Sequence, residues 1–524
     1  MTRTDPSPPT SRLHRAVFAG CAALLLLAGC GGGGGGSSIA GNGGNGNGSS
    51  WTPGVFLDAS TFRNMCENPR GGSWPDIQGT TTDENNFLRS YSNDTYLWYD
   101  EIVDRDPSLY ATLEYFDLLK TEATTASGAD KDRFHFTYPT DEWIALSQSG
   151  ASAGYGVQFA VLEDEPPRSV LVAYTDPGTP ATGANLVRGA AILEVDGADM
   201  VSGNDVATLN NGLFPAGAGE THDFRVRDPD GTERDITLTS QIITSTPVQN
   251  VKTLQTANGP VGYLLFNDHI APAEPLLVDA IEQLEQDNIT DLVIDIRYNG
   301  GGYLYIASEL AYMIAGANAT GGATFEELSF NDKHPSTDPV TGDPLQPMPF
   351  FNTSDAGQPL PTLDLARVFV LTGPGTCSAS ESIINGLRGI DVEVIQIGST
   401  TCGKPYGFYP TDNCGTTYFT IQFRGENDKG FGDYADGFSP QNAPGPQTTP
   451  IPGCQVADDF SRPLGDPAEQ RLAAALDYIG GAGCPAPTSV NVPGIGKTAA
   501  RRYADEDLIL PRAPWREMRL LERR

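Results

Sequence analysis

The chain has 524 residues, more than one ordinary core of about 100–150 residues accommodates, so the sequence predicts about three folded units with flanking segments. Its 33 basic and 66 acidic residues give a net charge of −33, and such a field repels phosphate backbones and anionic headgroups. We therefore expect no nucleic-acid partner and no membrane binding through basic patches.

The first 50 residues are predicted to be targeting and tethering sequence. Residues 1–29 combine early arginines with an apolar stretch too short to span a membrane, a pattern typical of a signal peptide. Leu27–Cys30 resembles a bacterial lipobox, which implies cleavage before Cys30 and lipidation of that residue; an ordinary secretory signal is the alternative. Residues 30–50 are almost purely Gly, Asn and Ser, which predicts a flexible tether.

These features predict a protein of the cell envelope, lipid-anchored and facing the periplasm or the cell surface. The lipid anchor is then its only membrane contact. Gly31, directly after the lipidated cysteine, favours the outer membrane by analogy with Gram-negative lipoproteins.

Six further cysteines follow Cys30, and an even number in an exported chain favours up to three disulfides. They are Cys66, Cys377, Cys402, Cys414, Cys454 and Cys484. Nearness in sequence suggests pairing Cys402 with Cys414 and Cys454 with Cys484, although sequence alone does not choose among the pairings. Neither the cysteine spacing nor the five scattered histidines indicate a zinc site, so we expect no metal and no other cofactor.

Four regions follow the tether in chain order. Residues 51–150 are rich in aromatics with helical patches, which predicts a small N-terminal helical region. Residues 151–245 contain short β-branched runs broken by Gly and Pro, typical of a small β domain. Residues 246–480 alternate amphipathic helices with apolar strands, which predicts an α/β core. Residues 481–524 form a C-terminal extension that is Pro-rich and then basic, and its role stays open.

Elements of the two folded domains can be placed by their patterns. In the β domain, strands are expected at 156–159, 169–172, 191–195 and 235–238. In the core, helices are expected at 277–284, 307–314 and 472–479, and buried strands at 291–296, 366–371 and 392–397. Residues 316–362 lack periodicity and indicate a long surface excursion.

In α/β sheets, ligands bind beyond the carboxyl ends of the strands, so the segments after these three strands are the candidate site. The first, Arg297–Gly302, ends in glycines that let backbone N–H groups approach a ligand. A structural turn is one alternative. A phosphate loop is another, but neither a following Lys-Ser or Lys-Thr nor a G-x-G-x-x-G motif supports it.

The second segment places Ser378 at the start of a predicted helix. Ser378-x-x-Glu381 is a formal capping box, which is the simpler interpretation. The same position also puts a hydroxyl in the positive field of a helix N-terminus, which favours a developing oxyanion.

The third segment carries Gly403-Lys404, where a solvated surface lysine is the simpler interpretation. As a general base Lys404 must be neutral, which burial favours. The lack of histidine near these segments in sequence, and of any G-x-S-x-G, argues against a Ser-His-Asp hydrolase.

These three motifs resemble those of the carboxyl-terminal processing (tail-specific) serine proteases, peptidase family S41. Ser378–Glu381 matches the S-A-S-E nucleophile motif, Gly403-Lys404 the G-K base motif and Asp295–Gly302 the D-L-R-x-N-x-G-G loop, within a resemblance from about 85 to 480. The resemblance implies an α/β protease core of layered sheet and helices, of the ClpP/crotonase type. It also implies an inserted or preceding β-rich PDZ-like domain and a small N-terminal helical region.

By this resemblance Ser378 is the nucleophile, Lys404 the general base, and the N–H groups of Gly301 and Ala379 form the oxyanion hole. The PDZ-like domain is expected to hold a peptide carboxylate at the loop formed by Gly154, Tyr155, Gly156 and Val157. The implied function is a serine endopeptidase that cleaves extended polypeptides through an acyl-enzyme and recognises their C-terminal ends. The oligomeric state is left open.

The chain departs from the family pattern around the base. Many members carry Gln four residues after the lysine, where this chain has Phe408, and Gln422 is the suggested substitute. A catalytically inactive periplasmic peptide-binding scaffold is therefore the second hypothesis, and a hydrolase of non-peptide esters the third. Cys377 and Cys402 flank the two motifs, and a disulfide between them would lock the site.

Overall fold

The computed structural model describes residues 51–445 and 449–487. The predicted signal segment, the lipidation site Cys30, the tether and the C-terminal extension from 488 onward lie outside these residues. Within the described ranges, none of the helices combines the length and the apolar character needed to cross a membrane.

The core is built around a six-stranded mixed sheet in the order β12-β13-β14-β17-β18-β25. The first two strands pair antiparallel and the other neighbours pair in parallel. The strands are β12 (Val248–Thr256), β13 (Gly259–Phe266), β14 (Asp291–Asp295), β17 (Arg367–Thr372), β18 (Glu393–Gly398) and β25 (Gly453–Gln455). The three buried strands predicted from sequence are confirmed as β14, β17 and β18. Because they are parallel neighbours, their carboxyl ends meet at one edge of the sheet.

Helices cover both faces of this sheet, since alternate side chains of a strand point to opposite sides. On one face Leu292 and Val370 pack with α6, α7 and α8, and on the other Val293 and Phe369 pack with α9. The helices are α6 (Ala273–Gln286), α7 (Leu304–Thr320), α8 (Ala379–Gly389) and α9 (Gln470–Ile479). The predicted helices fall within α6, α7 and α9, and the predicted α/β class of the core is confirmed.

Shorter strands form three small sheets beside the core, in the orders β16-β15-β22-β19, β20-β21-β3 and β23-β24. They are β15 (Thr324–Ser329), β16 (Met348–Pro349), β19 (Tyr406–Gly407), β20 (Thr411–Asn413), β21 (Thr416–Phe419), β22 (Phe423–Glu426), β23 (Phe438–Pro440) and β24 (Thr449–Ile451). The surface excursion predicted at 316–362 is wrong in its first part. There α7 continues past a kink at Gly316, and β15 buries Phe325 beside α8.

The N-terminal region is joined to the core by a strand and a disulfide. Its elements are α1 (Thr81–Thr95), α2 (Thr112–Asp117), α3 (Thr140–Ser149), β1 (Met65–Cys66), β2 (Ile77–Gln78), β3 (Phe136–Pro139) and the 3-10 turns Ala59–Thr61, Tyr99–Glu101 and Pro107–Leu109. Strand β3 pairs antiparallel with β21, and Cys66 is bonded to Cys414. The region is therefore more than the helical appendage expected from sequence, because it supplies an edge strand to the core.

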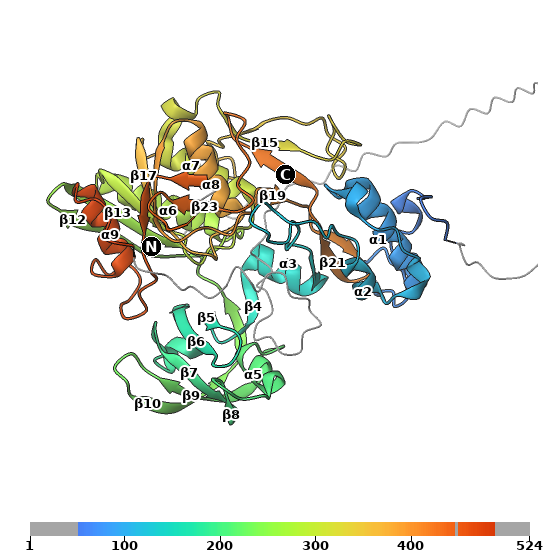
Figure 1. Cartoon of the computed structure of the whole chain (residues 1–524), viewed down its shortest axis with the longest axis horizontal. Coiled ribbons are helices and arrows are strands. Elements are labelled where there is room, and N and C mark those ends of the chain that lie inside the picture. Colours follow the sequence, from blue (N-terminus) through green and yellow to red (C-terminus); the bar gives the residue numbers. More distant parts are fainter. Residues whose placement is uncertain (1–50, 446–448, 488–524) are drawn as a thin grey trace, which may run out of the picture. The chain divides into compact units, whose positions relative to one another are not determined.

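The middle β unit, residues 151–245, forms its own sheet in the order β10-β9-β7-β6-β5, with β8 paired to β7. Its elements are β4 (Ala151–Gly154), β5 (Val157–Glu163), β6 (Ser169–Thr175), α4 (Pro180–Gly183), β7 (Ala191–Val195), β8 (Ala198–Asp199), α5 (Val206–Leu213), β9 (Thr221–Arg227), β10 (Glu233–Thr239) and β11 (Gln241–Thr244). The four predicted strands correspond to β5, β6, β7 and β10, and β5 begins at Val157, one residue after the predicted start. Strands β4 and β11 pair as a ribbon through which the chain enters and leaves this unit (Figure 1).

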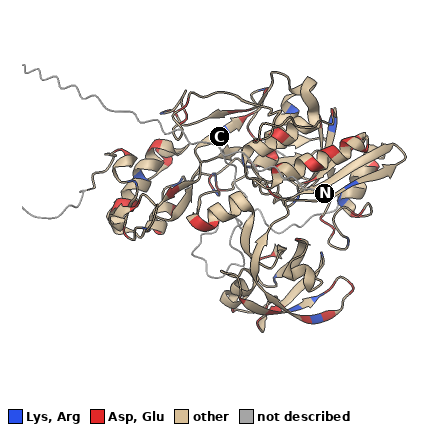
Figure 2. Cartoon of the chain, turned by 180° about the vertical axis from the view of Figure 1, so that it is seen from behind, with Lys and Arg blue, Asp and Glu red and all other residues tan. Residues whose placement is uncertain are grey.

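Acidic positions occur across the described helices, strands and loops, whereas the β9–β10 hairpin carries both signs of charge (Figure 2). On that hairpin Arg225 and Arg227 both pair with Glu233. The basic side chains there are thus engaged with neighbouring carboxylates.

Three disulfides link the six cysteines. Of the two pairings suggested by nearness in sequence only one holds, while the bond considered between Cys377 and Cys402, beside the two motifs, is present. Cys454 is bonded to Cys484 as expected. The pairing of Cys402 with Cys414 is wrong, because Cys402 is bonded to Cys377 and Cys414 to Cys66. Cys414 lies between β20 and β21, and β21 pairs with β3 of the N-terminal region. The partner of Cys414 is therefore distant in sequence but close in the fold.

A buried carboxyl on β15 predicts a pH-dependent stability. Glu326 is buried, and burial raises its pKa from 4.5 to about 8, while the nearby Ser382 hydroxyl opposes the shift. The folded protein keeps this proton up to about pH 8, whereas the unfolded chain loses it near 4.5. Its contribution to stability is therefore complete below about 4.5 and is lost as pH rises through about 8.

We expect Glu326→Gln to unfold at higher urea than the wild type at pH 9 and at similar urea at pH 5. Glu327→Gln, on the exposed neighbour in the same strand, is the matched control and should change neither value. An equal effect of Glu326→Gln at both pH values would contradict the assignment.

Candidate active site

The three predicted segments converge at the carboxyl ends of β14, β17 and β18. Cys377 N–H donates to the Asn299 carbonyl (3.1 Å), as does the Ser380 hydroxyl (3.1 Å), so the serine loop is docked on the Arg297–Gly302 loop. Thr376 Oγ1 adds a bond to the Ile296 carbonyl (2.8 Å). The structure thus brings together the segments that the sequence singled out.

Ser378 occupies the turn between β17 and α8 in a strained backbone conformation. Its φ is 60° and its ψ is −120°, a combination that non-glycine residues rarely adopt and that clusters at functional sites. The side chain is fully buried, and its Oγ has no hydrogen-bond partner among the described residues. The capping-box interpretation explains Glu381, which accepts from the Ser378 N–H, but it does not explain the hydroxyl.

The Glu381 carboxylate joins the serine loop (residues 373–378, between β17 and α8) to the lysine loop (residues 399–405, between β18 and β19). One oxygen accepts from the N–H groups of Ser378 (3.0 Å) and Lys404 (2.8 Å). The other accepts from Gly403 N–H (2.8 Å) and the Thr401 hydroxyl (2.5 Å). One side chain therefore fixes the backbone on which the nucleophile and the base both stand.

This role requires an ionised carboxylate in a dry place. Burial raises the pKa of Glu381 above its usual value, while the bonds from Thr401 and from the N–H groups of Lys404, Gly403 and Ser378 oppose that shift. Since every one of these bonds is donated to Glu381, the four donors stabilise its charged form.

Lys404 is fully buried, so the interpretation as a solvated surface lysine is wrong. Its Nζ lies 4.2 Å from the ring centre of Phe408 and 4.9 Å from that of Phe134. Phe408, at the position where many family members carry Gln, therefore forms one wall around the amine. The suggested substitute Gln422 bonds instead to Tyr409, Tyr91 and Thr95.

The two expected oxyanion donors are adjacent but differently engaged. A Cβ on Gly301 would lie 2.8 Å from Ser378 Cβ and 3.0 Å from Ala379 N, and its φ of 100° also favours glycine. Ala379 is the first residue of α8, so its N–H has no acceptor within the helix. The Gly301 N–H donates to Asn299 Oδ1 (3.0 Å).

Sequence reasoning missed His269 and the role of the Asn299 side chain. His269 Nδ1 lies 3.0 Å from Asn299 Oδ1, and Asn299 Nδ2 donates to the Phe266 carbonyl (3.0 Å). The chain distance from residue 269 to the three motifs hid this histidine. Asn299 could have been found, because it occupies the Asn position of the D-L-R-x-N-x-G-G pattern.

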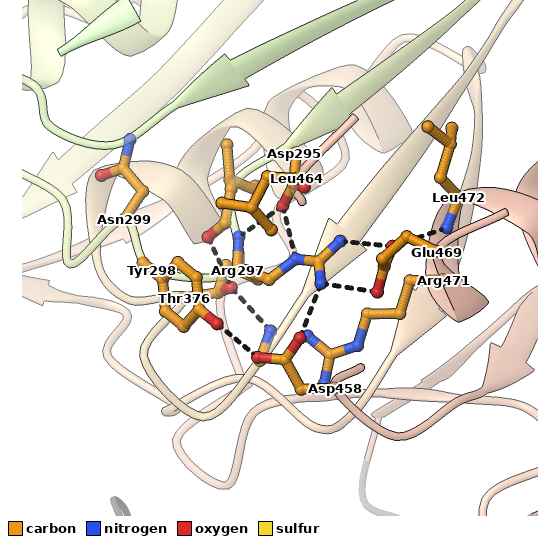
Figure 3. A network of polar contacts seen from close by, with 12 residues as sticks. Asp295, Arg297, Tyr298, Asn299, Thr376, Asp458, Leu464, Glu469, Arg471 and Leu472 are labelled. Carbon is orange, nitrogen blue, oxygen red and sulfur yellow. Dashed lines mark hydrogen bonds and ion pairs between the residues drawn. The ribbon is translucent and has the colours of Figure 1, made fainter. Parts of the chain in front are cut away.

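A buried network of charges supports the loop that carries Asn299. The Arg297 guanidinium is surrounded by the carboxylates of Asp295, Asp458 and Glu469 (Figure 3). Arg188, from the middle β unit, also bonds to Asp458 (2.6 Å). Burial acts to raise the pKa of Asp458, but its neighbouring arginines hold it well below the usual value. The arginines thus keep Asp458 ionised, and the network ties three parts of the chain to the loop.

The expected peptide-carboxylate loop lies where β4 meets β5. Tyr155 is buried and donates to the Gly212 carbonyl (2.9 Å), so its ring anchors the loop to α5. Gly156 has a φ of 72°, and a Cβ there would lie 2.4 Å from Thr179. Strand β5, which begins at Val157, is an edge strand of its sheet. Gly154 ends β4 and pairs with Gln241.

Among the residues that the structure describes, two clusters of a glutamate and two cysteines are close enough to surround a metal ion. They are Cys66, Glu84 and Cys414, and Cys377, Glu381 and Cys402. In both, the two sulfurs are joined in a disulfide, so neither cluster offers the thiolates that metals such as zinc prefer.

Comparison with known proteins confirms the family resemblance. The model of peptidase family S41 matches residues 260–408, the segment that contains all three motifs. The chain is 28% identical over 269 residues to a carboxyl-terminal-processing protease of Picosynechococcus sp. (strain ATCC 27264 / PCC 7002 / PR-6), covering 50% of this chain and 56% of that protein.

A second relative is carboxyl-terminal-processing peptidase 2, chloroplastic, of Arabidopsis thaliana. The identity is 27% over 170 residues, covering 31% of this chain and 32% of the relative. The chain thus spans about half or less of these relatives. Among solved structures, a protein described as an S41 protease from Bacteroides fragilis NCTC 9343 has a TM-score of 0.56 at 22% identity, covering 79% of this chain and all of that one. That similarity concerns the fold.

Replacing Glu381 should separate the serine loop from the lysine loop. In Glu381→Gln an amide NH₂ replaces one carboxylate oxygen, so the two donors that bond to that oxygen in the wild type lose their acceptor. We expect a loss of about 2–4 kcal/mol in the free energy of unfolding by urea. We also expect about a 10²-fold slower reaction of Ser378 with a fluorophosphonate, because the site geometry loosens. Glu326→Gln, a buried carboxyl that does not join the loops, is the control. Unchanged Ser378 reactivity in Glu381→Gln would contradict the role.

The Cys377–Cys402 disulfide should differ from Cys454–Cys484 in its effect on the reactivity of Ser378 and not in its effect on stability. Its sequence separation of 25 is close to the 30 of Cys454–Cys484, so removing either pair should cost a similar stability of about 3–4 kcal/mol. We expect Cys377→Ser/Cys402→Ser to slow Ser378 labelling and Cys454→Ser/Cys484→Ser to leave it unchanged at temperatures where both are folded. Equal labelling rates in the two double variants would refute this.

Proposed function

We propose that this chain is a serine endopeptidase of the carboxyl-terminal processing type, with Ser378 as nucleophile and Lys404 as general base. The observation that carries the proposal is the Glu381 carboxylate, which binds the N–H groups of both residues while their side chains are completely buried. A dry site favours the neutral amine that a lysine base needs.

In the proposed reaction Ser378 Oγ attacks the scissile carbonyl while Lys404 Nζ takes its proton. The tetrahedral oxyanion then lies at the N-terminus of α8, where the Ala379 N–H is directed and the helix dipole is favourable. Gly301 joins as a second donor when its N–H leaves Asn299 Oδ1. Collapse of the intermediate expels the amine with the lysine proton, and water then hydrolyses the acyl-enzyme by the reverse proton path.

The middle β unit is proposed to be a PDZ-like domain that binds the C-terminal end of a polypeptide. Strand addition needs an edge strand, and β5 lies at the edge of its sheet directly after the loop Gly154–Val157. Main-chain bonds to such an edge suit extended substrates of varied sequence.

The proposed location is the cell envelope, with a lipid anchor at Cys30. Three disulfides among the described residues support an oxidising compartment outside the cytoplasm. The lipobox and the tether rest on the sequence alone.

An inactive peptide-binding scaffold is the second candidate, and one observation favours it. Ser378 Oγ makes no hydrogen bond within the described residues, so the proton path to Lys404 is not formed in this structure. Catalytic hydrogen bonds often tighten only in the complex with substrate, which is why the protease remains the proposal.

Labelling and cleavage together test the proposal. A fluorophosphonate should modify Ser378 in the wild type, and an unstructured polypeptide with an apolar C-terminal end should be cleaved. Ser378→Ala and Lys404→Ala should each lower cleavage by at least about 10³-fold, while Lys429→Ala, on an exposed lysine, should not.

Each other outcome identifies an alternative. Peptide binding without labelling or cleavage would establish the scaffold. Hydrolysis of simple esters with no cleavage of any peptide would establish an esterase. Equal cleavage by the wild type and Lys404→Ala would end the role of the lysine.

A further inference from the structure

A short segment of the N-terminal region, Asp132–Phe134, reaches the lysine loop. It lies outside the segment 260–408 that matches the family. Arg133 Nη2 donates to the carbonyl of Cys402, which directly precedes Gly403, and to that of Ala435 (3.4 Å). A Cβ on Gly403 would lie 2.3 Å from the Ala435 carbonyl oxygen, so the segment at Ala435 packs directly against this glycine. Arg133 therefore binds both segments, the one that carries Gly403 and the one that packs on it.

Phe134 forms a second wall around the amine, in addition to the one that Phe408 forms. Lys404 Nζ lies 4.9 Å from the Phe134 ring centre and 4.2 Å from that of Phe408. Both rings are buried, in one apolar cluster that also contains Cys377. The N-terminal region therefore contributes to the immediate surroundings of the base.

The Asp132–Phe134 segment is held rigidly. Asp132 accepts from the Tyr96 hydroxyl (2.7 Å) and from the Phe134 N–H (2.9 Å). Two residues further on, Phe136 begins β3 and stacks on Phe419 of β21 with ring centres 4.3 Å apart. The positions of Arg133 and Phe134 are thus set before any substrate binds.

We propose that Arg133 and Phe134 are positioning residues for Lys404, so that the N-terminal region completes the catalytic site. Arg133 fixes the backbone that carries the base, and Phe134 excludes water from its amine. This inference rests on the proposed function.

The two effects of a phenyl ring on an amine oppose each other, and their sizes decide the sign. A ring face attracts the ammonium form, but phenylalanine does this weakly. Burial disfavours the ammonium form by up to 3–5 pKa units when it is complete. Exclusion of water therefore dominates, and removing the Phe134 ring should favour the protonated lysine.

The test for Phe134 is the pH dependence of Ser378 labelling by a fluorophosphonate on the full chain. We expect Phe134→Ala to move the pH of half-maximal labelling rate upward by about one unit, because water reaches the amine. Phe134→Leu keeps the site apolar and should move it less, and it serves if the alanine variant does not fold. Phe87→Ala removes a buried ring elsewhere in the N-terminal region and should leave the profile unchanged.

The test for Arg133 separates positioning from substrate binding. Arg133→Met should lower kcat for a peptide about tenfold with KM unchanged, and Arg133→Lys, which can still reach one carbonyl, should restore part of the loss. Arg105→Met removes another arginine of this region that donates to two backbone carbonyls and should have no effect.

The outcomes distinguish this inference from the proposed function. An unlabelled wild type would refute the Ser378–Lys404 mechanism itself. A labelled wild type with an unshifted pH profile in folded Phe134 variants, or with the same kcat loss in Arg133→Met and Arg105→Met, would refute only the positioning roles.

Discussion

The acceptance of four hydrogen bonds by the single Glu381 carboxylate is the interaction on which the site depends. Parallel strands β17 and β18 bring the serine and lysine loops to the same edge of the sheet, but strand pairing alone does not set the positions of residues beyond the strand ends. A buried carboxylate with two acceptor oxygens does so, because bonds to a charged acceptor are strong and directional in a dry interior. Cys377–Cys402 adds a covalent link between the same two loops.

The surrounding regions serve this edge of the sheet in different ways. Arg297 and its carboxylates stabilise the loop that carries Gly301, and Arg188 extends that network into the middle β unit. The N-terminal region places an aromatic wall, Phe134, beside the amine of Lys404. A solvent-exposed lysine would remain protonated at neutral pH, so the burial of this amine is as necessary to the proposed chemistry as its distance from the serine.

Much of the core could be predicted from sequence, because β14, β17 and β18 are continuous apolar runs that must be buried on both faces. The parallel order of those strands also explains why Ser378 and Lys404, 26 positions apart, could be expected at one place. Contacts between distant parts of the chain could not be predicted. Phe134 carries no local signal, and the short strand β15 lies in a segment where Gly and Pro hide its apolar positions. For Cys402 the sequence offered both Cys377, beside the serine motif, and Cys414, nearer in sequence, and did not choose between them.

Hydrogen exchange at single backbone amides tests the central interaction most directly. The account predicts that the N–H groups of Ser378, Gly403 and Lys404 exchange as slowly as those of the central strands, and that all three become faster together in Glu381→Gln. Fast exchange at Gly403 and Lys404 in the wild type, at the rate of an exposed turn, would show that no buried carboxylate joins the two loops and would contradict the account.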